Sequence, residues 1–159
     1  MKRDGINPGG THFPILAAAV ARTWGDVLEL GIGDYSTPML HHMLARSSKH
    51  LVSLETSEEW LELFAHFRSL NHELNLMKRW EDVAVGHNWG VVFVDVAPGD
   101  ARPGLAAAFK DTAHFVVCHD TEAYGDGWDK IKGVFRHETV WKEYPTWTTV
   151  YSNFEEFKL

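Results

Sequence analysis

Short runs of apolar residues alternate with longer amphipathic segments along most of this chain. The apolar runs have the length and composition of buried strands, and they span residues 27–31, 51–55, 74–77, 89–95 and 114–120. Apolar residues between these runs recur at helical spacing and predict helices over residues 12–23, 38–48, 57–70 and 102–110. This alternation is typical of an α/β protein whose parallel sheet carries helices on both faces, joined by right-handed crossovers.

Two of the predicted helices begin with capping patterns. Ser36 or Thr37 precedes Pro38, and proline suits the first position of a helix. Thr56 is followed three residues later by Glu59, which is the capping-box pattern. Both helices are therefore expected to begin directly after a strand, where parallel α/β sheets bind their ligands.

Past Gly125 the apolar pattern is weaker and favours strands. Residues 134–141 and 148–152 are rich in β-branched and aromatic side chains, and a short connection around Pro145 separates them. Two strands joined so closely pair antiparallel. The sequence therefore predicts a Rossmann-like fold, a mostly parallel, twisted sheet that ends in an antiparallel C-terminal hairpin.

Composition narrows the class of protein. The 159 residues suffice for a single domain, with residues 1–10 expected to form a flexible arm. A net charge of −7 disfavours a nucleic-acid partner, and the single cysteine leaves no intramolecular disulfide. No apolar run reaches the length of about 18 residues that a membrane span needs, and the polar N-terminus does not resemble a signal peptide. We therefore expect a cytoplasmic protein with a small-molecule substrate.

The turn after the first apolar run carries the most information about function. Gly31 and Gly33 permit a tight turn between strand and helix and a close approach of the backbone to a ligand. Glu55 ends the second predicted strand, and its carboxylate can accept hydrogen bonds from both hydroxyls of a ribose. A glycine turn followed by such a carboxylate predicts a nucleoside site at the carboxyl edge of the sheet.

Residues 29–33, taken together with Glu55, resemble the S-adenosylmethionine (SAM) site of class I methyltransferases. The resemblance extends over about residues 11–153 and includes the antiparallel last strand. It implies that the glycine loop lies under the amino-acid part of SAM, that Glu55 binds the ribose, and that Asp82 or Glu81 contacts the adenine amine. The cofactor-binding residues that it implies are Glu29, Gly31, Gly33, Thr37, Glu55, Thr56, Trp80, Glu81, Asp82 and Asp95.

The chain also departs from the pattern of that family. Asp34 stands near the helix start, where it disfavours a pyrophosphate and therefore a nicotinamide cofactor. The segment between Asp82 and Trp89 is too short for the helix that the family has there, and no segment is long enough for a substrate-binding lid. The acceptor site is therefore expected to be open, or to be completed by a second subunit of a homo-oligomer.

The catalytic candidates lie at the ends of the fourth and fifth predicted strands. Three segments are similar to small methyltransferase-like domains that include sugar and polysaccharide methyltransferases: residues 53–60, 95–102 and 119–122. We expect Asp95, His119 and Asp120 to be catalytic, because a histidine can act as a general base near neutral pH. Some relatives bind a divalent metal at these strand ends, which makes Asp95 and Asp120 candidate Mg²⁺ ligands. Alternation along the strand would point His119 and Asp120 to opposite faces.

The sequence thus predicts a SAM-dependent methyltransferase acting on a small-molecule or sugar acceptor. A SAM-binding accessory module without catalysis and a metal-dependent enzyme on the same sheet are the alternatives. Purely structural roles are also open for these residues. Glu55 can stabilise the start of the following helix, and Trp60 can belong to the core. His119 and Asp120 can form a hydrogen-bonded pair that holds a loop. Four aromatic residues are expected to form an acceptor wall or a dimer contact: Tyr124, Trp128, Tyr144 and Trp147.

Overall fold

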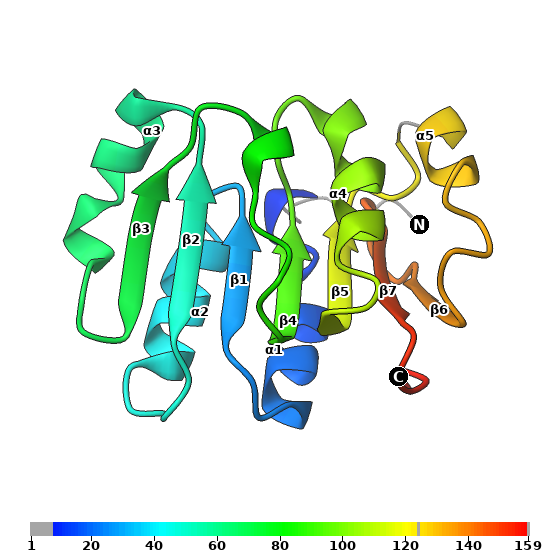
Figure 1. Cartoon of the computed structure of the whole chain (residues 1–159), viewed down its shortest axis with the longest axis horizontal. Coiled ribbons are helices and arrows are strands. Elements are labelled where there is room, and N and C mark those ends of the chain that lie inside the picture. Colours follow the sequence, from blue (N-terminus) through cyan, green and yellow to red (C-terminus); the bar gives the residue numbers. More distant parts are fainter. Residues whose placement is uncertain (1–7, 124, 159) are drawn as a thin grey trace.

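One seven-stranded sheet with the strand order β3-β2-β1-β4-β5-β7-β6 forms the centre of the protein (Figure 1). The computed structural model describes residues 8–123 and 125–158. The strands are β1 (Val27–Leu30), β2 (Leu51–Glu55), β3 (His72–Leu76), β4 (Trp89–Val94), β5 (Ala113–His119), β6 (His137–Trp141) and β7 (Thr148–Ser152). The first five are parallel, so their carboxyl ends meet at the upper edge of the sheet in Figure 1. The five predicted parallel strands are confirmed.

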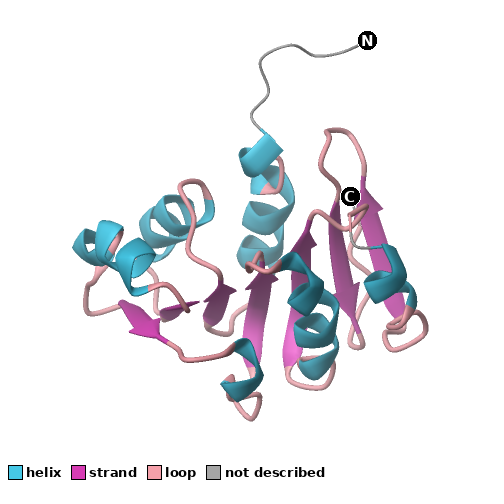
Figure 2. Cartoon of the chain, turned by 90° about the horizontal axis from the view of Figure 1, so that it is seen from above, coloured by secondary structure: helices cyan, strands magenta, loops and turns pink. Residues whose placement is uncertain are grey.

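Helices cover both faces of the sheet. On one face lie α1 (Phe13–Arg22), α2 (Ser36–Leu44) and α3 (Glu58–Leu63), and on the other lie α4 (Arg102–Ala108) and α5 (Gly125–Asp129) (Figure 2). Four short 3-10 helices complete the described chain: η1 (Pro8–Gly10), η2 (Ala65–Phe67), η3 (Trp80–Asp82) and η4 (Gly99–Ala101). The part of the predicted N-terminal arm that the structure describes is therefore helical, and residues 1–7 lie outside the described residues. Within the described chain, no helix has the length and apolar character needed to cross a membrane.

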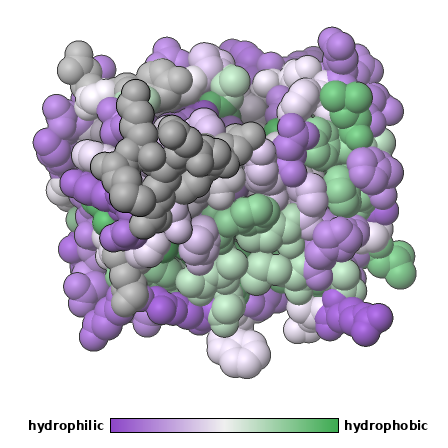
Figure 3. Space-filling model, turned by 180° about the vertical axis from the view of Figure 1, so that it is seen from behind, coloured by the Kyte–Doolittle hydropathy of each residue, from purple (hydrophilic) through white to green (hydrophobic). Residues whose placement is uncertain are grey.

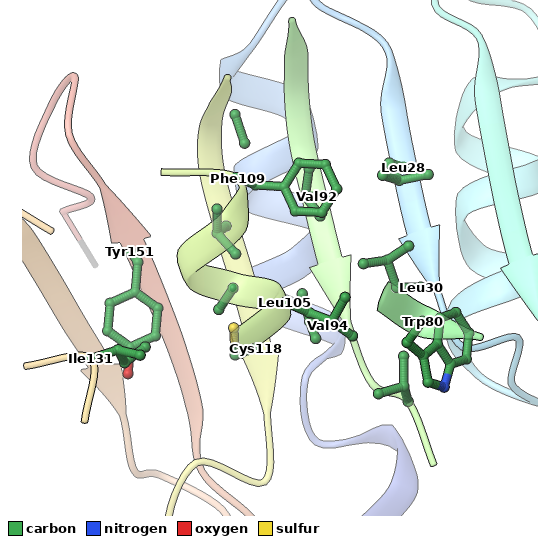
Figure 4. Packing of buried hydrophobic residues seen from close by; sticks show 14 of the residues in the cluster. Leu28, Leu30, Trp80, Val92, Val94, Leu105, Phe109, Cys118, Ile131 and Tyr151 are labelled. Carbon is green, nitrogen blue, oxygen red and sulfur yellow. The ribbon is translucent and has the colours of Figure 1, made fainter. Parts of the chain in front are cut away.

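Alternate residues of the central strands face opposite helix layers. Leu28 and Val92 belong to the hydrophobic cluster that includes Leu105 of α4 (Figure 4). Val27 belongs instead to the cluster that packs against α1 through Leu16. Because both faces are covered, β1 and β4 are apolar along most of their length, as is usual for central parallel strands. Seen from outside, the α1–α2 face has hydrophobic residues gathered at its centre, over α1, and hydrophilic residues around them (Figure 3).

The C-terminal strands pair as predicted but insert in an order that the sequence does not reveal. β7 lies between β5 and β6 and is antiparallel to both. The edge strand β6 consequently runs in the same direction as the first five strands. Only β7 opposes the sheet, so the predicted antiparallel hairpin is confirmed and its place in the sheet is now defined.

The start of α2 differs from the predicted cap. Ser36 and Thr37 lie inside the first turn of α2, and the N-cap residue Tyr35 makes no side-chain capping bond. The Thr37 hydroxyl donates to the carboxylate of Glu29 instead, at 2.9 Å. The predicted hydroxyl cap is wrong because a buried carboxylate competes for the same hydroxyl.

The start and the length of α3 also differ from prediction. Ser57, not Thr56, is the N-cap residue, and its Oγ accepts a hydrogen bond from the Trp60 N–H at 3.2 Å. The helix ends at Leu63 and is followed by η2, so the helix predicted over residues 57–70 is broken into two short pieces. The periodicity of its apolar residues is retained across both pieces, which explains the longer prediction.

One glycine is required where β1 leaves the sheet. Gly31 has a φ of +90°, and a Cβ added there would lie 2.3 Å from the carbonyl oxygen of Asp95. The backbones that follow β1 and β4 therefore approach each other more closely than any side chain permits. This approach brings the glycine loop next to the residues that follow β4.

We expect Gly31→Ala to lower the free energy of unfolding by about 3 kcal/mol, since it adds both backbone strain and a steric clash. Urea unfolding followed by circular dichroism measures the change. Gly104→Ala is the matched control, because it lies in α4 with no atom within 4 Å of an added Cβ. The control should be neutral or stabilise the fold by up to about 1 kcal/mol. Equal stability of the Gly31→Ala variant and the wild type would contradict the described approach of the two backbones.

Candidate functional site

A buried carboxylate holds the glycine loop from below. Glu29 is fully buried, and its carboxylate accepts hydrogen bonds from the hydroxyls of Thr37 at 2.9 Å and Ser53 at 2.5 Å. The Thr37 hydroxyl in turn accepts the N–H of Gly33 at 3.0 Å. Burial raises the pKa of Glu29 to about 7, although these hydroxyls and that of Ser36 oppose the shift. The structure thus places Glu29 beneath the loop, where its carboxylate contacts the protein's own hydroxyls.

Glu55 connects the end of β2 to the glycine loop and to the start of α3. Its Oε2 accepts the N–H of Ile32 at 3.2 Å, and its Oε1 accepts the N–H groups of Thr56 at 2.7 Å and Ser57 at 2.9 Å. The indole N–H of Trp60 donates to the carbonyl oxygen of Ile32 at 2.6 Å. These bonds fix the loop and the carboxylate relative to each other, and only one of the described bonds reaches Oε2.

A cavity of about 380 Å³ lies beside this carboxylate, between the end of β2, η3 and η4. Thr56, Trp80 and Glu81 line it, together with residues that follow β4. Trp80 is itself buried, and its indole N–H donates to the carbonyl oxygen of Ala97 at 3.0 Å, so its ring is a fixed wall of the cavity. Asp82 does not line the cavity and instead forms an exposed ion pair with Arg79 at 2.7 Å.

The ends of β4 and β5 are joined by a buried guanidinium. Arg102 contacts Oδ1 of Asp95 through Nη2 and Oδ2 of Asp120 through Nη1, both at 2.8 Å. It also donates to the carbonyl oxygens of Val96 at 2.9 Å and His119 at 3.1 Å. Burial alone would raise the pKa of Asp95, but the His119 hydrogen bond and the Arg102 charge hold it below the usual value. The carboxylate pair predicted for Mg²⁺ is thus bridged by Arg102.

His119 lies between this carboxylate pair and two hydroxyls. Its Nδ1 is 3.3 Å from Oδ2 of Asp95 and 3.6 Å from Oδ1 of Asp120. Its Nε2 is 2.8 Å from the hydroxyl of Thr146 and 3.0 Å from that of Thr11. The expectation that His119 and Asp120 diverge is wrong, because Asp120 has a φ of 56° and ends the strand alternation. The structure therefore brings all three predicted catalytic residues together.

A second histidine lies against the first. His12 immediately precedes α1, is 1% exposed, and has no hydrogen-bond partner at either ring nitrogen among the described residues. Its ring centroid is 4.8 Å from that of His119 and 4.7 Å from that of Phe93. Burial, and next the proximity of His119, lower the pKa of His12 to about 4. His12 is therefore neutral at physiological pH.

A larger cavity of about 460 Å³ lies between α5 and the β6–β7 pair. Trp128 and Trp147, predicted as parts of an acceptor wall, both line it, as does Glu122, which accepts the N–H of Trp147 at 2.7 Å. Tyr144 is not among the lining residues, and Tyr124 lies outside the described residues. The wall that the structure does contain begins directly after the end of β5.

Four residues of the site were not predicted from the sequence: Thr11, His12, Arg102 and Thr146. Arg102 had a detectable signature, because a buried arginine needs acidic partners and two predicted strand ends supplied them. His12 and the two threonines had none, since a histidine before an apolar helix and isolated threonines are common in any chain. They enter the site only because distant segments fold onto the end of β5.

Comparisons with known proteins identify the fold. No protein-family model matches the chain, and no curated protein matches it in sequence. A Klebsiella pneumoniae structure assigned as an O-methyltransferase is 14% identical, with a TM-score of 0.69 over 95% of this chain and 83% of that one. Human methyltransferase-like protein 13 with bound S-adenosylhomocysteine (SAH) is 14% identical, with a TM-score of 0.65 over 91% of this chain and 82% of that one.

A third structure, a Streptococcus pneumoniae protein assigned as a tRNA (m1A22) methyltransferase, is 10% identical. Its TM-score is 0.60 over 92% of this chain and 72% of that one. The chain therefore has the fold of SAM-dependent methyltransferases, as the sequence predicted. Identities this low establish the fold alone, and activity has to be argued from the site.

The buried carboxylate under the glycine loop predicts a pH-dependent stability. The pKa of Glu29 rises from 4.5 in the unfolded chain to about 7 in the fold, so the folded state binds more protons between these pH values. Its contribution to stability is therefore present below pH 4.5 and is lost as the pH rises to 7. The loss amounts to roughly 3 kcal/mol.

We expect Glu29→Gln to remove this dependence. Measured by urea unfolding at several pH values, the free energy of unfolding of the variant should increase relative to the wild type between pH 4.5 and 7. The buried histidines titrate with the opposite sign, but they are common to both proteins and cancel in the difference. If the difference in the free energy of unfolding between variant and wild type does not vary with pH, burial does not raise the pKa of Glu29.

Proposed function

We propose that this chain is a SAM-dependent methyltransferase that acts on a small-molecule or sugar acceptor. The observation that carries the proposal is the arrangement of two groups along one edge of the sheet. The glycine loop follows β1 and Glu55 ends β2, whereas Asp95 follows β4 and its partner His119 ends β5. A cofactor lying along this edge would extend from a ribose-binding carboxylate to a pair of groups that can handle a proton.

The residues present fit the cofactor. Oε2 of Glu55 has one described donor, and a carboxylate oxygen can accept two hydrogen bonds, so it retains capacity for a ribose hydroxyl. Gly33 has no Cβ, and a Cβ built there would meet only the Ser36 hydroxyl, at 3.5 Å, so the loop presents bare backbone. The cavity beside Thr56 has a fixed tryptophan wall and an acidic residue, Glu81, which suits the flat ring and amine of adenine.

Chemistry would take place at the ends of β4 and β5. SAM supplies a methyl group on a sulfonium that is already activated, so the protein has to align the acceptor and take up its proton. The hydrogen bond from Nδ1 of His119, at 3.3 Å, and the charge of Arg102 keep Asp95 ionised. The hydroxyls of Thr11 and Thr146 at Nε2 of His119 support a role of this nitrogen in hydrogen-bonding a hydroxyl group.

The acceptor class is inferred from the cavity between α5 and the β6–β7 pair, whose lining begins with Thr121 and Glu122 after the end of β5. It combines the rings of Trp128 and Trp147 with the charged side chains of Glu122 and Lys142. Aromatic faces and polar groups together suit a hydroxylated molecule such as a sugar. The net charge of −7 disfavours a nucleic acid, even though one structure of the same fold is assigned to tRNA.

Cofactor binding is tested by isothermal titration of the full chain with SAM and with SAH, in the presence of EDTA. We expect both ligands to bind, and Glu55→Ala to weaken the binding about 10- to 100-fold, because it removes charge-assisted bonds to the ribose. Glu59→Ala is the control, since Glu59 is an exposed carboxylate on α3 nearby. Unchanged affinity of a folded Glu55→Ala protein would contradict the ribose assignment.

Catalysis is tested by following SAH formation with a panel of sugars and other small hydroxylated acceptors. With an accepted substrate, we expect Asp95→Asn to lower kcat about 100-fold or more, because it weakens the pair that takes up the acceptor proton. Far-UV circular dichroism confirms that the variant is folded. Tight SAH binding without turnover of any acceptor would instead favour the accessory module.

A further inference from the structure

The starting observation is a buried side chain that the methyl transfer proposed above does not use. His12 is 1% exposed, and both of its ring nitrogens lack a hydrogen-bond partner among the described residues. A buried imidazole whose nitrogens make no hydrogen bond is uncommon in folded proteins, and a neutral imidazole nitrogen is a good ligand for a metal ion. The His12 ring is packed against His119, with 4.8 Å between the centroids, so whatever His12 binds lies next to His119 as well.

The surroundings of His119 allow a metal ion to replace the proton on Nδ1. The Thr11 hydroxyl can donate to the carbonyl oxygen of Pro8 at 2.9 Å, and it then accepts the Nε2–H of His119 at 3.0 Å. The Thr146 hydroxyl lies even closer to Nε2, at 2.8 Å. By contrast, Nδ1 is 3.3 Å from Asp95, which is longer than the range of about 2.7–2.9 Å for a charge-assisted bond. Without a metal ion the ring proton lies on Nδ1 and faces the Asp95 carboxylate. A metal ion at Nδ1 would displace this proton, and Nε2 could then carry the ring proton and donate it to the Thr11 hydroxyl.

The charges around this point favour a cation. Asp95 and Asp120 contribute two negative charges, and Arg102 neutralises one of them through Oδ1 of Asp95 and Oδ2 of Asp120. Oδ2 of Asp95 points to His119 and is not contacted by the guanidinium in the described ion pairs. One uncompensated negative charge therefore faces the two imidazole rings.

We infer that His12, Asp95 and His119 form a binding site for a first-row divalent transition metal ion such as Zn²⁺ or Co²⁺. One ligand atom from each residue lies within 4.8 Å of the other two. Metal–ligand bonds of about 2.0–2.2 Å would require the three side chains to approach one another by a small shift. Thr11 and Thr146 hold the second nitrogen of His119, which is how proteins usually orient an imidazole ligand.

The ligand set defines which metal ion the site prefers. Two imidazole nitrogens and one carboxylate oxygen suit Zn²⁺, Co²⁺ or Fe²⁺, whereas Mg²⁺ and Ca²⁺ prefer oxygen ligands. The site therefore differs from the Asp95–Asp120 pair predicted for Mg²⁺, and it includes His12, which precedes α1. Three protein ligands leave at least one position for a further oxygen ligand.

This inference rests on the proposed function for the role of the metal ion, although not for its existence. A hydroxyl of the acceptor would take the open position, and the ion would lower the pKa of that hydroxyl. In that case His119 serves as a ligand, and the hydroxyl loses its proton to solvent or to a nearby carboxylate. The acceptor would thereby be oriented at the ends of β4 and β5.

The test is a Co²⁺ titration of the full chain, freed of metal with EDTA and dialysed, without SAM. Visible d–d absorption reports bound Co²⁺. We expect one tightly bound ion per chain, displaced by Zn²⁺ and not by millimolar Mg²⁺. His12→Phe retains an aromatic ring among its aromatic neighbours without the nitrogens, and it should weaken the binding about 100-fold or more. If that variant does not fold, His12→Asn removes the imidazole with a smaller polar side chain.

His41→Ala is the matched control, because His41 contacts a separate group of histidines near α2, His42 and His72 among them. We expect its Co²⁺ spectrum and affinity to equal those of the wild type. Absence of the absorption band, or equal affinity of His12→Phe and wild type, would overturn the inference. Displacement by Mg²⁺ as effective as by Zn²⁺ would overturn it too. Because the SAH titration is performed in EDTA and the Co²⁺ titration without SAM, the two proposals fail independently.

Discussion

The geometry of the site depends on the buried guanidinium of Arg102. It is the first residue of α4, and its donors reach both Asp95 and Asp120 and the carbonyl oxygens of Val96 and His119. Neighbouring strands are no longer held together where their ladder of hydrogen bonds stops. Here the Arg102 side chain binds polar groups at the ends of both β4 and β5. An unpaired carboxylate in this place would cost several kcal/mol, so the loops after β4 and β5 are fixed relative to each other.

The other half of the site is fixed by carboxylates that serve the backbone. Glu29 acts on the glycine loop through Thr37, and Glu55 accepts amide N–H groups from the loop and from the start of α3. Glu29 and Glu55, which the sequence predicts as cofactor-binding residues, thus also hold the glycine loop in its conformation. This arrangement orders the loop before any ligand binds, which lowers the entropy cost of binding.

The fold was predicted correctly because its strands and helices follow from burial patterns in the sequence. The predictions that were wrong concern local details that depend on contacts with other residues. β1 and β4 are covered on both faces, which makes their sequences apolar and recognisable. The cap of α2 failed because the Thr37 hydroxyl bonds to Glu29, a residue from another element. The divergence expected for His119 and Asp120 failed because the left-handed conformation of Asp120 ends the strand.

The sequence by itself determined the class of sheet, the glycine turn and the acidic residues that end the strands. These features repeat along the chain with the periods of strands and helices, so they can be read locally. Only the tertiary structure decided that Thr11, His12 and Thr146 meet His119, and that Arg102 joins two carboxylates. Such contacts join distant segments, and Thr11 and His119 lie more than a hundred residues apart in the sequence. No local pattern in the sequence encodes a contact of this kind. They arise because a parallel sheet gathers the ends of distant strands at one edge.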